Sequence, residues 1–273
     1  MNEKLNQAFQ ALESKGYNVL YIGYYGAHNY NLADEKSDYD FKAIVIPTLS
    51  ELIKREVIST VIECEFGNID TKDLITFTSN MNKGNFSYIE ALKTKYHIDL
   101  GEKLLGISIQ ELFKDVKVNY MSMVGAIHEK RKALTHEYPS KTEEFAQYNC
   151  DPKQFLQAIR LYDILRDRNK AGENYNLSFK EYGNDGIQFE LTEFESESST
   201  RKYEFTREDL ISLKRKLVMP LDETIKIFDY IQLKAREFLP KDYHFQPLDY
   251  TNEIIELLIK YFTKTLKEEN NDR

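Results

Sequence analysis

Two aspartates, Asp38 and Asp40, stand one residue apart in the segment SDYDFKAIVIP, directly before a run of apolar residues. In an extended chain the side chains at positions i and i+2 point to the same face, so the two carboxylates project together while Tyr39 points away. Such a pair is unfavourable unless a proton or a cation lies between the two groups. Mg²⁺ prefers oxygen ligands of this kind, and the pair therefore predicts a metal site. The alternative is that both residues are ordinary strand-end acids in a turn.

A glycine turn, Gly26-Ala27, lies shortly before these acids. It follows an expected strand, and residues 27–33 (AHNYNLA) are expected to form a short helix. Exposed backbone N–H groups and a helix N-terminus make a favourable seat for phosphate. Metal-binding carboxylates that face a phosphate cradle are the minimum arrangement for transferring a nucleotidyl group, because two cations lower the charge on the triphosphate and activate the attacking hydroxyl.

Strands must position both parts of this site. The segments NVLYIGYY and YDFKAIVI are rich in β-branched and aromatic residues and end at Gly26 and Pro47. Two further short strands are expected to form a hairpin that turns at Gly67-Asn68. Apolar residues at helical spacing predict an amphipathic helix at the start of the chain. The elements expected here are helices at 3–14 and 50–57 and strands at 18–25, 39–46, 60–66 and 69–74.

From about residue 74 onward the pattern changes to helix, with one break at Lys83-Gly84-Asn85. The alternating stretch IQFELTEFE and a loop rich in Glu, Ser and Thr predict a hairpin inserted within 174–206. Further helices are expected at 74–82, 87–94, 155–167, 207–217, 222–239 and 252–266. We therefore expect an α+β protein, with a small mixed-sheet domain over 1–100 followed by a mainly helical domain over 101–273.

Composition limits the class of protein. The net charge is −8, which argues against nucleic-acid binding over the whole surface of the protein. Basic residues do cluster at 128–134 (HEKRKAL) and 213–217 (LKRKL), although such runs are usually solvated helix faces. The two cysteines lack any C-x-x-C spacing, which suggests neither a zinc site nor a disulfide framework and fits a reducing cytoplasm. No apolar stretch approaches the roughly 20 residues that span a bilayer, so no membrane is expected as a partner.

Four blocks of the chain resemble the DNA polymerase beta-like nucleotidyltransferase superfamily, and more narrowly its stand-alone bacterial and phage-type predicted nucleotidyltransferases. The pattern of that superfamily is a Gly-Ser, a spacer, an Asp-x-Asp and a later single Asp. The blocks follow in the expected order and span most of the chain: 26–47 (GAHNYNLADEKSDYDFKAIVIP), 69–92 with its IDTKDLITF and KGNFSYIEAL, 150–161 (CDPKQFLQAIRL) and 207–215 (REDLISLKR).

The resemblance implies a catalytic domain over 1–100 in which Asp38 and Asp40 bind metal. It also implies that Asp70 is the third acid, which holds a second cation with Asp40 and helps to deprotonate the acceptor. Asp70 has an alternative as a helix cap, because an Asp just before a helix often has that role. Glu63 and Glu65 are rivals for the third position. Asp73 is read as part of the helix start.

One position departs from the family pattern, since Ala27 stands where the family has serine. Its backbone N–H remains, but a hydroxyl contact to phosphate is lost, and a hydrogen bond to a charged group is worth about 1.5 to 3 kcal/mol. Ser37 or His28 could supply the missing donor, although His28 is equally consistent with ordinary turn chemistry.

Three basic residues complete the expected nucleotide site. Lys83 could neutralise triphosphate, whereas Asn85 beside it is equally well a helix cap. Lys153 and Arg160 stand seven residues apart, so both lie on one face of a helix that opens after Pro152. The resemblance implies that these two residues contact the nucleotide or the acceptor. A role confined to the surface is the alternative.

The expected activity is a nucleotidyl transfer that uses Mg²⁺ or Mn²⁺, with an NTP as substrate and pyrophosphate as product. The first candidate acceptor is RNA, as in tRNA end modification or repair. The second is a protein side chain or a small hydroxyl compound, which suits the acidic balance better. A third hypothesis, motivated by Ala27, is a catalytically silent module that binds a nucleotide or a partner.

Overall fold

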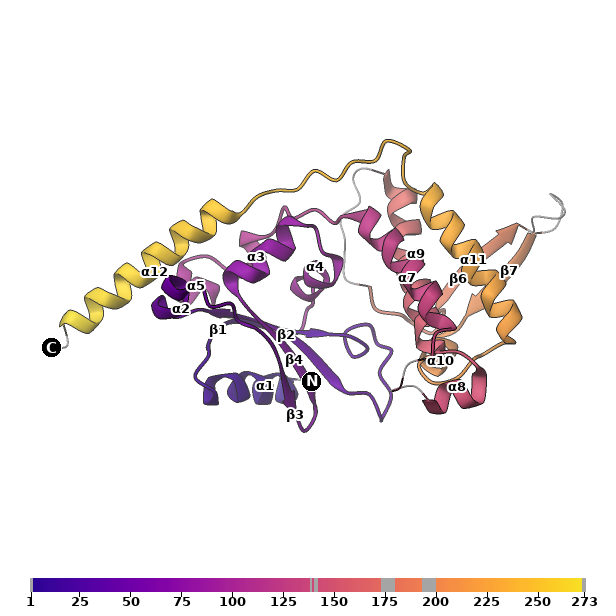
Figure 1. The fold of residues 1–273 in the computed structure, drawn as a ribbon, viewed down its shortest axis with the longest axis horizontal. Helices are drawn as coiled ribbons and strands as arrows, with labels where there is room; N and C mark the ends of the chain where they lie inside the picture. Colours follow the sequence, from indigo (N-terminus) through magenta and orange to yellow (C-terminus); the bar gives the residue numbers. More distant parts are fainter. Residues whose placement is uncertain (1, 138, 140–141, 173–179, 193–199, 272–273) are drawn as a thin grey trace. The chain divides into compact units, whose positions relative to one another are not determined.

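A computed structural model describes residues 2–137, 139, 142–172, 180–192 and 200–271 of the chain (Figure 1). The chain forms two compact units. We define the sheet unit as Met1–Tyr30, Glu35–Asn119 and Gln246–Arg273, and the helical unit as Asn31–Asp34 and Tyr120–Phe245. The first holds a mixed five-stranded sheet with helices and the second is mainly helical with a two-stranded hairpin, which confirms the predicted α+β class. The domain boundary expected at residue 100 stays a prediction.

The sheet has the strand order β3-β4-β2-β1-β5. Its strands are β1 (Asn18–Tyr25), β2 (Tyr39–Ile46), β3 (Ser59–Cys64), β4 (Gly67–Asp73) and β5 (His97–Asp99). Strands β2 and β4 run parallel, and the other neighbouring pairs are antiparallel. The strands predicted at 18–25 and 39–46 have these bounds in the structure. They place the turn after β1 opposite the first residues of β2, because Tyr25 pairs with Asp40.

The two faces of the sheet differ in chemistry. Helix α1 (Asn2–Ser14) covers one face, on which it packs with strand residues in a core that includes Leu5, Ala8, Leu12, Ile22, Phe41 and Ile69. Each such aliphatic side chain gains roughly 1.5 to 3 kcal/mol from burial. Because side chains alternate along a strand, the intervening residues point to the opposite face. That face carries Asp40, Lys42 and Asp70, and helices α3 (Leu74–Asn82) and α4 (Phe86–Leu92) lie over it (Figure 1).

The hairpin of β3 and β4 turns two residues earlier than the sequence suggests. The turn consists of Glu65 and Phe66, and Gly67 already pairs with Cys64 as the first residue of β4, so the turn predicted at Gly67-Asn68 is wrong. The glycine is needed for a different reason. A Cβ at Gly67 would lie 1.9 Å from the carbonyl oxygen of Tyr39, and the backbone has a φ of +150°. Gly67 therefore allows β4 to approach the segment that bears the two aspartates.

The other helices of the sheet unit are short, apart from the last. They are α2 (Leu49–Lys54), α5 (Gly101–Leu105), α6 (Ile109–Leu112) and α12 (Thr251–Asn271). Helix α2 ends before the predicted residue 57 because Arg55 adopts a left-handed conformation with a φ of 57°. The predicted break at 83–85 is confirmed, with Lys83 as the C-cap of α3 and Asn85 as the N-cap of α4. Asp73 caps α3, as expected for a helix start, because its carboxylate accepts the Thr76 N–H at 2.7 Å.

The helical unit contains α7 (Tyr120–Leu134), α8 (Thr142–Tyr148), α9 (Pro152–Ala171), α10 (Arg207–Ser212), α11 (Leu221–Glu237) and a hairpin of β6 (Ile187–Thr192) with β7 (Thr200–Phe205). Phe155, Phe205 and Phe228 form an aromatic cluster in its interior. The inserted hairpin is confirmed, whereas its expected tip and the residues 174–179 before it lie outside the described residues. Helix α10 ends before the predicted residue 217. No described helix has an apolar stretch long enough to cross a membrane.

Candidate functional site

The candidate site begins at the turn that follows β1. Gly26 has a φ of +78°, and a Cβ built on it would lie 2.7 Å from Oδ2 of Asp40. A side chain at this position would both strain the backbone and push against the carboxylate. The predicted turn glycine and the second of the paired aspartates are therefore in direct contact, which is the juxtaposition that the sequence suggested.

The short helix expected over residues 27–33 is wrong. The segment forms a tight turn in which the N–H of Asn29 donates to the Gly26 carbonyl at 3.0 Å and that of Tyr30 to the Ala27 carbonyl at 3.2 Å. Asn31 then adopts a left-handed conformation with a φ of 61°, which prevents the helix from continuing. A helix dipole is thus not available for phosphate here. The turn itself still offers donors, since the N–H groups of Ala27 and His28 have no acceptor in the described part of the chain.

His28 holds the turn against the segment that bears the aspartates. Its ring stacks on Tyr39, with centroids 3.8 Å apart and planes inclined by 10°. Its Nε2 donates to the carbonyl oxygen of Ser37 at 3.2 Å. A neutral imidazole that donates through Nε2 has no second N–H for a phosphate. The structure therefore brings His28 and Ser37 into contact through this hydrogen bond. Both residues are predicted as donors that replace the hydroxyl of the family serine.

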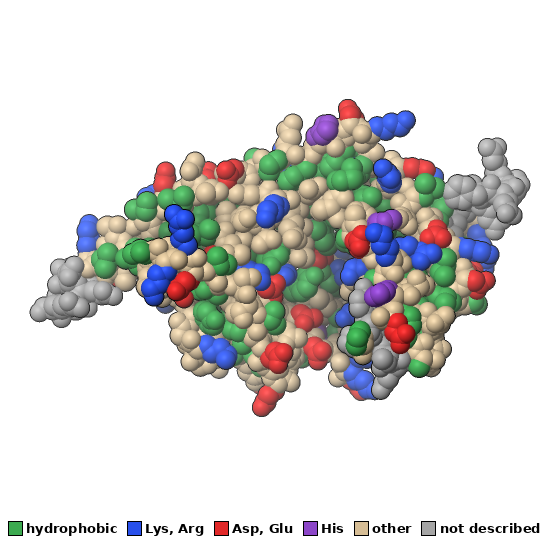
Figure 2. Space-filling model, viewed as in Figure 1, with side chains coloured by type: hydrophobic (Ala, Val, Ile, Leu, Met, Phe, Trp, Pro, Cys, Tyr) green, Lys and Arg blue, Asp and Glu red, His purple; other side chains and the backbone are tan. Residues whose placement is uncertain are grey.

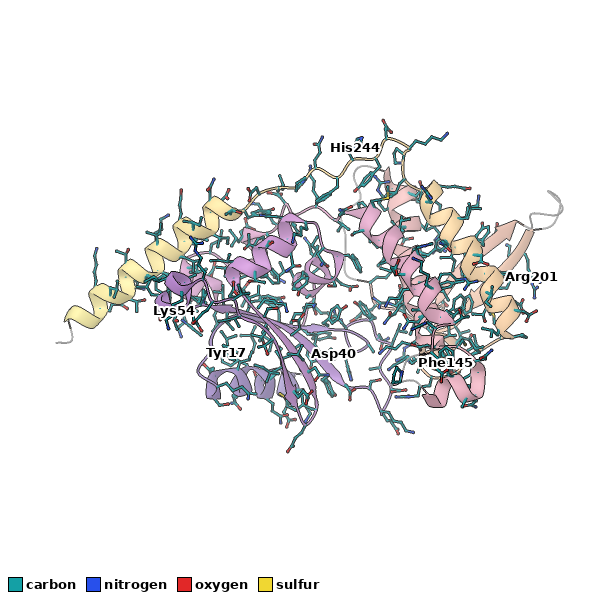
Figure 3. All side chains as sticks on the ribbon, in the orientation of Figure 1. Tyr17, Asp40, Lys54, Phe145, Arg201 and His244 are labelled. Carbon is teal, nitrogen blue, oxygen red and sulfur yellow. The ribbon has the colours of Figure 1, made fainter. Side chains whose placement is uncertain are left out.

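The two predicted metal ligands flank Tyr39 at the start of β2. Asp38 is exposed just before the strand, and Asp40 is half-buried within it. Figure 3 labels Asp40 on the sheet. Tyr39 is fixed from the backbone as well as from its ring, because its N–H donates to the Phe66 carbonyl at 2.8 Å. The residue between the two acids is thus held on three sides, by His28, Phe66 and Gly67.

The third predicted acid, Asp70, lies on the same face of the sheet and binds two lysines. Its Oδ2 is 2.6 Å from Lys42 Nζ and its Oδ1 is 2.9 Å from Lys72 Nζ. Burial alone would raise the pKa of Asp70, but the hydrogen bonds and charges of the two lysines outweigh it and hold the pKa below its ordinary value. The carboxylate is therefore ionised and already neutralised by protein cations.

Register sets the separation of the acids. In the parallel pair of β2 and β4, Asp40 lies opposite Asn68, and Lys42 lies opposite Asp70. Asp70 is therefore two residues further along β4 than the residue opposite Asp40. With a strand spacing of about 4.8 Å and a rise of about 3.3 Å per residue, the Cα atoms of Asp40 and Asp70 are roughly 8 Å apart. In the described residues no group of three or more His, Cys, Asp or Glu side chains is arranged to hold a metal ion. Metal binding by Asp38, Asp40 and Asp70 therefore stays a prediction.

The rival acids lie on β3 and in the turn that follows it. Glu63 is exposed on β3 and pairs with Asn68, which places it beyond β4 from Asp40. Glu65 is exposed in the hairpin turn, directly before Phe66, whose carbonyl accepts the Tyr39 N–H. The choice of Asp70 over Glu63 and Glu65 as the third acid stays a prediction.

Lys42 is the residue of this site that sequence reasoning missed. It is 7% exposed, and its ammonium lies over the rings of Tyr25 and Tyr88, at 4.6 and 4.2 Å from their centroids. Burial and the charge of Asp70 raise the pKa of the Tyr88 hydroxyl. The signal was a lysine inside the otherwise apolar strand YDFKAIVI, at an even spacing from Asp40. Two tyrosine faces and one carboxylate offset the cost of burying its charge.

The residues of the second block, 69–92, that follow Asp73 have mainly structural contacts. Lys83 is exposed, and its backbone N–H caps α3. The Asn85 side chain accepts the Ser87 N–H at 3.1 Å, which fits its alternative as a cap. Glu90 is buried and accepts a hydrogen bond from the hydroxyl of Tyr30, so it ties α4 to the turn after Gly26.

Lys153 and Arg160 belong to the helical unit. Both lie on α9, Lys153 exposed and Arg160 half-buried, seven residues apart as the sequence indicates. Their predicted contact with a nucleotide or an acceptor stays a prediction.

Comparison with known proteins adds no family assignment. No protein-family model matches the sequence, and no curated protein matches it.

Proposed function

We propose that this chain is a Mg²⁺-dependent nucleotidyltransferase that transfers NMP from a nucleoside triphosphate to a hydroxyl acceptor. The observation that carries the proposal is the contact between Gly26 and the Asp40 carboxylate, because it brings a metal-binding group against a turn with available N–H donors. The resemblance of residues 26–47 to the DNA polymerase beta-like nucleotidyltransferases supports the same activity.

The donor set fits magnesium that arrives with a nucleotide. Proteins usually bind Mg²⁺ through one or two carboxylates plus substrate phosphates, rather than through a complete cage of protein ligands. Asp38 and Asp40 would supply the two carboxylates, and Mn²⁺ could replace Mg²⁺ at oxygen ligands. When bound, the cation supplies charge neutralisation at the triphosphate and activation of the attacking hydroxyl.

The roles of the protein groups follow from their positions. The N–H groups of Ala27 and His28 bind phosphate oxygens, and the stack of His28 on Tyr39 keeps the two acids oriented. Asp70 is expected from the resemblance to act with Asp40 at a second cation. For that role, the Asp70 carboxylate must release Lys42 or Lys72 and bind the cation in its place. Substitutions of Asp70 and Lys42 test this step directly.

A second candidate function is a module that binds a nucleotide without transferring it. Two observations favour it: Ala27 lacks the family hydroxyl, and the Asp70 carboxylate is bound by two lysines. The proposed transferase has two possible classes of acceptor. The first is RNA, including a tRNA end. The second is a protein side chain or a small hydroxyl compound, and the net charge of −8 suits this second class better.

The test uses α-labelled ATP, CTP, GTP and UTP with total RNA, with cell lysate and with the protein alone. Mg²⁺-dependent pyrophosphate release is measured for the wild type, Asp38→Asn, Asp40→Asn and the control Glu63→Gln, which removes an exposed acid from the same face. We expect both aspartate variants to lose at least a hundred-fold, about 2.7 kcal/mol of transition-state stabilisation. The control should keep the wild-type rate.

Each outcome assigns a function. Label in RNA indicates an RNA acceptor, and label in polypeptide indicates a protein acceptor. Nucleotide binding without release of pyrophosphate from any NTP would reject transfer and favour the silent module. Equal losses in the aspartate variants and in Glu63→Gln would reject the metal site.

A further inference from the structure

Helix α12 of the sheet unit has two apolar stripes, and one of them faces solvent. The inner stripe contains Ile254 and Leu258, which are buried, and it packs the helix against α3 and α5. The second stripe lies on the neighbouring side of the helix, where its four residues fall within about 60° of one another. We call it the outer stripe, and it consists of Ile255, Ile259, Phe262 and Leu266.

The outer stripe is not needed to hold α12 in place. The inner stripe and the hydrogen bond from Asn18 to the Tyr261 hydroxyl fix the helix. The three aliphatic residues of the outer stripe are between 47% and 60% exposed, and Phe262 is half-buried. Figure 2 shows hydrophobic side chains at the surface along α12, at the left of the view. Single exposed apolar residues are common, whereas a continuous apolar stripe marks an interaction surface.

The spacing of the outer stripe fits a second helix. Its residues follow one another at intervals of four, three and four positions. This is the alternation of the a and d positions along which two helices pack in a coiled coil. The stripe extends over about 16 Å, or roughly three turns. The surface therefore has the shape of a helix-pairing seam.

The charged residues of α12 are segregated along its length. The acids near its start are Glu253 and Glu256, and the lysines from its middle onward are Lys260, Lys264 and Lys267. The remaining acid with a described side chain, Glu268, pairs with Lys264 of the same helix at 3.9 Å. A second copy of α12 that runs antiparallel would therefore place the acidic start of each helix against the basic end of the other.

An antiparallel pair that is symmetric about the middle of the outer stripe also matches its apolar residues. In this register Ile259 lies opposite Phe262 of the second copy, and Ile255 lies opposite Leu266 of the second copy. The two-fold axis repeats both contacts, as in an isologous interface. The whole stripe is then covered without an insertion or a gap.

The same register pairs the charges that flank the stripe. Glu256 and Lys267 lie on one side of the outer stripe, and an antiparallel arrangement brings Glu256 close to Lys267 of the second copy. In a parallel pair, Glu256 would instead face the side of the helix that carries Leu258 and Thr265, where no cation lies. The charges therefore favour the antiparallel orientation.

A membrane surface suits this helix less well. Helices that lie on anionic membranes have an excess of Lys and Arg on their polar face. The described side chains of α12 contain three acids and three lysines, and the chain as a whole carries a net charge of −8. We propose that the outer stripe is the contact surface of a symmetric homodimer, in which α12 of one copy packs antiparallel against α12 of the other.

This surface is independent of the proposed transfer reaction, because none of its residues belongs to the turn after β1 or to the acids on the sheet. A contact through one short helix is at the small end of specific interfaces, so we expect a reversible dimer with a dissociation constant in the micromolar range.

Sedimentation velocity of the full chain, at concentrations that span the micromolar range, tests the apolar contact. The variant combines Ile255→Gln with Ile259→Gln, because glutamine is a good helix former. The matched control is Ile53→Gln, which removes another exposed isoleucine of the sheet unit, on α2. We expect the double variant to raise the dissociation constant roughly ten-fold or more and the control to change it less than two-fold. Far-UV circular dichroism checks that both are folded.

Charge reversal tests the orientation. Glu256→Lys and Lys267→Glu should each raise the dissociation constant by roughly three-fold or more, since each puts like charges opposite one another at two symmetric places. An equimolar mixture of these two variants should associate as the wild type does, because each copy then supplies the charge that the other needs. The variant with both changes should also recover wild-type association.

Three results would overturn the proposal. The first is a wild-type chain that stays monomeric over the whole concentration range. The second is a dimer that Ile255→Gln with Ile259→Gln leaves intact, or one in which the mixture of charge variants shows no recovery. The third is a monomer that sediments with vesicles of phosphatidylcholine and phosphatidylserine and loses this binding in the isoleucine variant, which would assign the outer stripe to a lipid surface.

Discussion

Replacing Asp70 by asparagine should destabilise the sheet unit, because Lys42 would lose its only described carboxylate partner. The side chains of Lys42 and Asp70 are 9% and 26% exposed, and Nζ and Oδ2 are 2.6 Å apart. Removing one partner of a buried ion pair costs about 3 to 5 kcal/mol. Since Asp70 is partly solvated and Lys42 keeps two tyrosine faces, each worth about 0.5 to 2 kcal/mol, we expect a loss of about 2 kcal/mol for Asp70→Asn.

The reverse change should cost less. In Lys42→Met the Asp70 carboxylate keeps Lys72 at 2.9 Å and retains access to water, so we expect a loss of about 1 kcal/mol. The double variant should lose about 2 kcal/mol, because the buried Lys42 ammonium is then absent, and Lys72, which loses Asp70, still donates to the Ser59 hydroxyl at 2.8 Å. The resulting coupling of about 1 kcal/mol lies within the range for residues in direct contact.

The dependence on pH tests the electrostatic origin of this contribution. The folded-state pKa of Asp70 is lowered, so its stabilisation is fully present above the ordinary pKa of an aspartate, about 3.9, and is lost as the pH falls through the folded-state value. The difference in free energy of unfolding between wild type and Asp70→Asn should therefore shrink as the pH falls below about 4.

Urea unfolding followed by far-UV circular dichroism between pH 3 and pH 7 measures this difference, and the chain has no tryptophan to serve as a probe instead. A difference that stays constant over this range would refute the ion pair as its cause. Transfer activity provides a second readout. If Asp70 serves only to neutralise Lys42, the double variant should regain pyrophosphate release, whereas a metal ligand would leave it inactive, which is the result that the proposed function predicts.

Two further substitutions test the geometry around the acids. Gly26→Ala should lose about 1 to 2 kcal/mol of stability because of its positive φ. It should also lose pyrophosphate release, because the new Cβ displaces the Asp40 carboxylate. The control is Gly16→Ala, which has a similar φ of +83° and no neighbour within 4 Å, and it should lose stability in thermal melts but keep activity. His28→Ala should lower stability by about 0.5 to 1.5 kcal/mol through the lost stack on Tyr39, whereas His28→Phe should restore most of it, and equal melting temperatures for the two variants would contradict a role for the stack.

Local chemistry explains the parts of this fold that the sequence predicts well. The strands at 18–25 and 39–46 are bounded by Gly26 and Pro47, and both are rich in β-branched and aromatic residues. Asp73 caps α3 through its own carboxylate. Such features depend on a few neighbouring residues, so they are visible in one sequence.

Features that depend on distant partners were predicted incorrectly or not at all. Gly67 resembles a turn glycine, yet it is required because Tyr39, 28 residues earlier, approaches it in the parallel strand. The pairing of Lys42 with Asp70 follows from the register of β2 and β4, which no local pattern sets. The helix expected after Gly26 fails at Asn31, whose left-handed conformation is accessible to asparagine but not required by it.

The order of segments in the sheet unit has a consequence for biosynthesis. Helix α12 packs against α3 and α5, and Tyr261 accepts a hydrogen bond from Asn18 at 2.5 Å. These partners leave the ribosome before the helical unit, which must be translated before α12 appears. At about 5 to 20 residues per second, that delay is roughly 6 to 25 seconds. During this time α12 does not yet cover its partners, so the sheet unit is completed only after the helical unit has been translated.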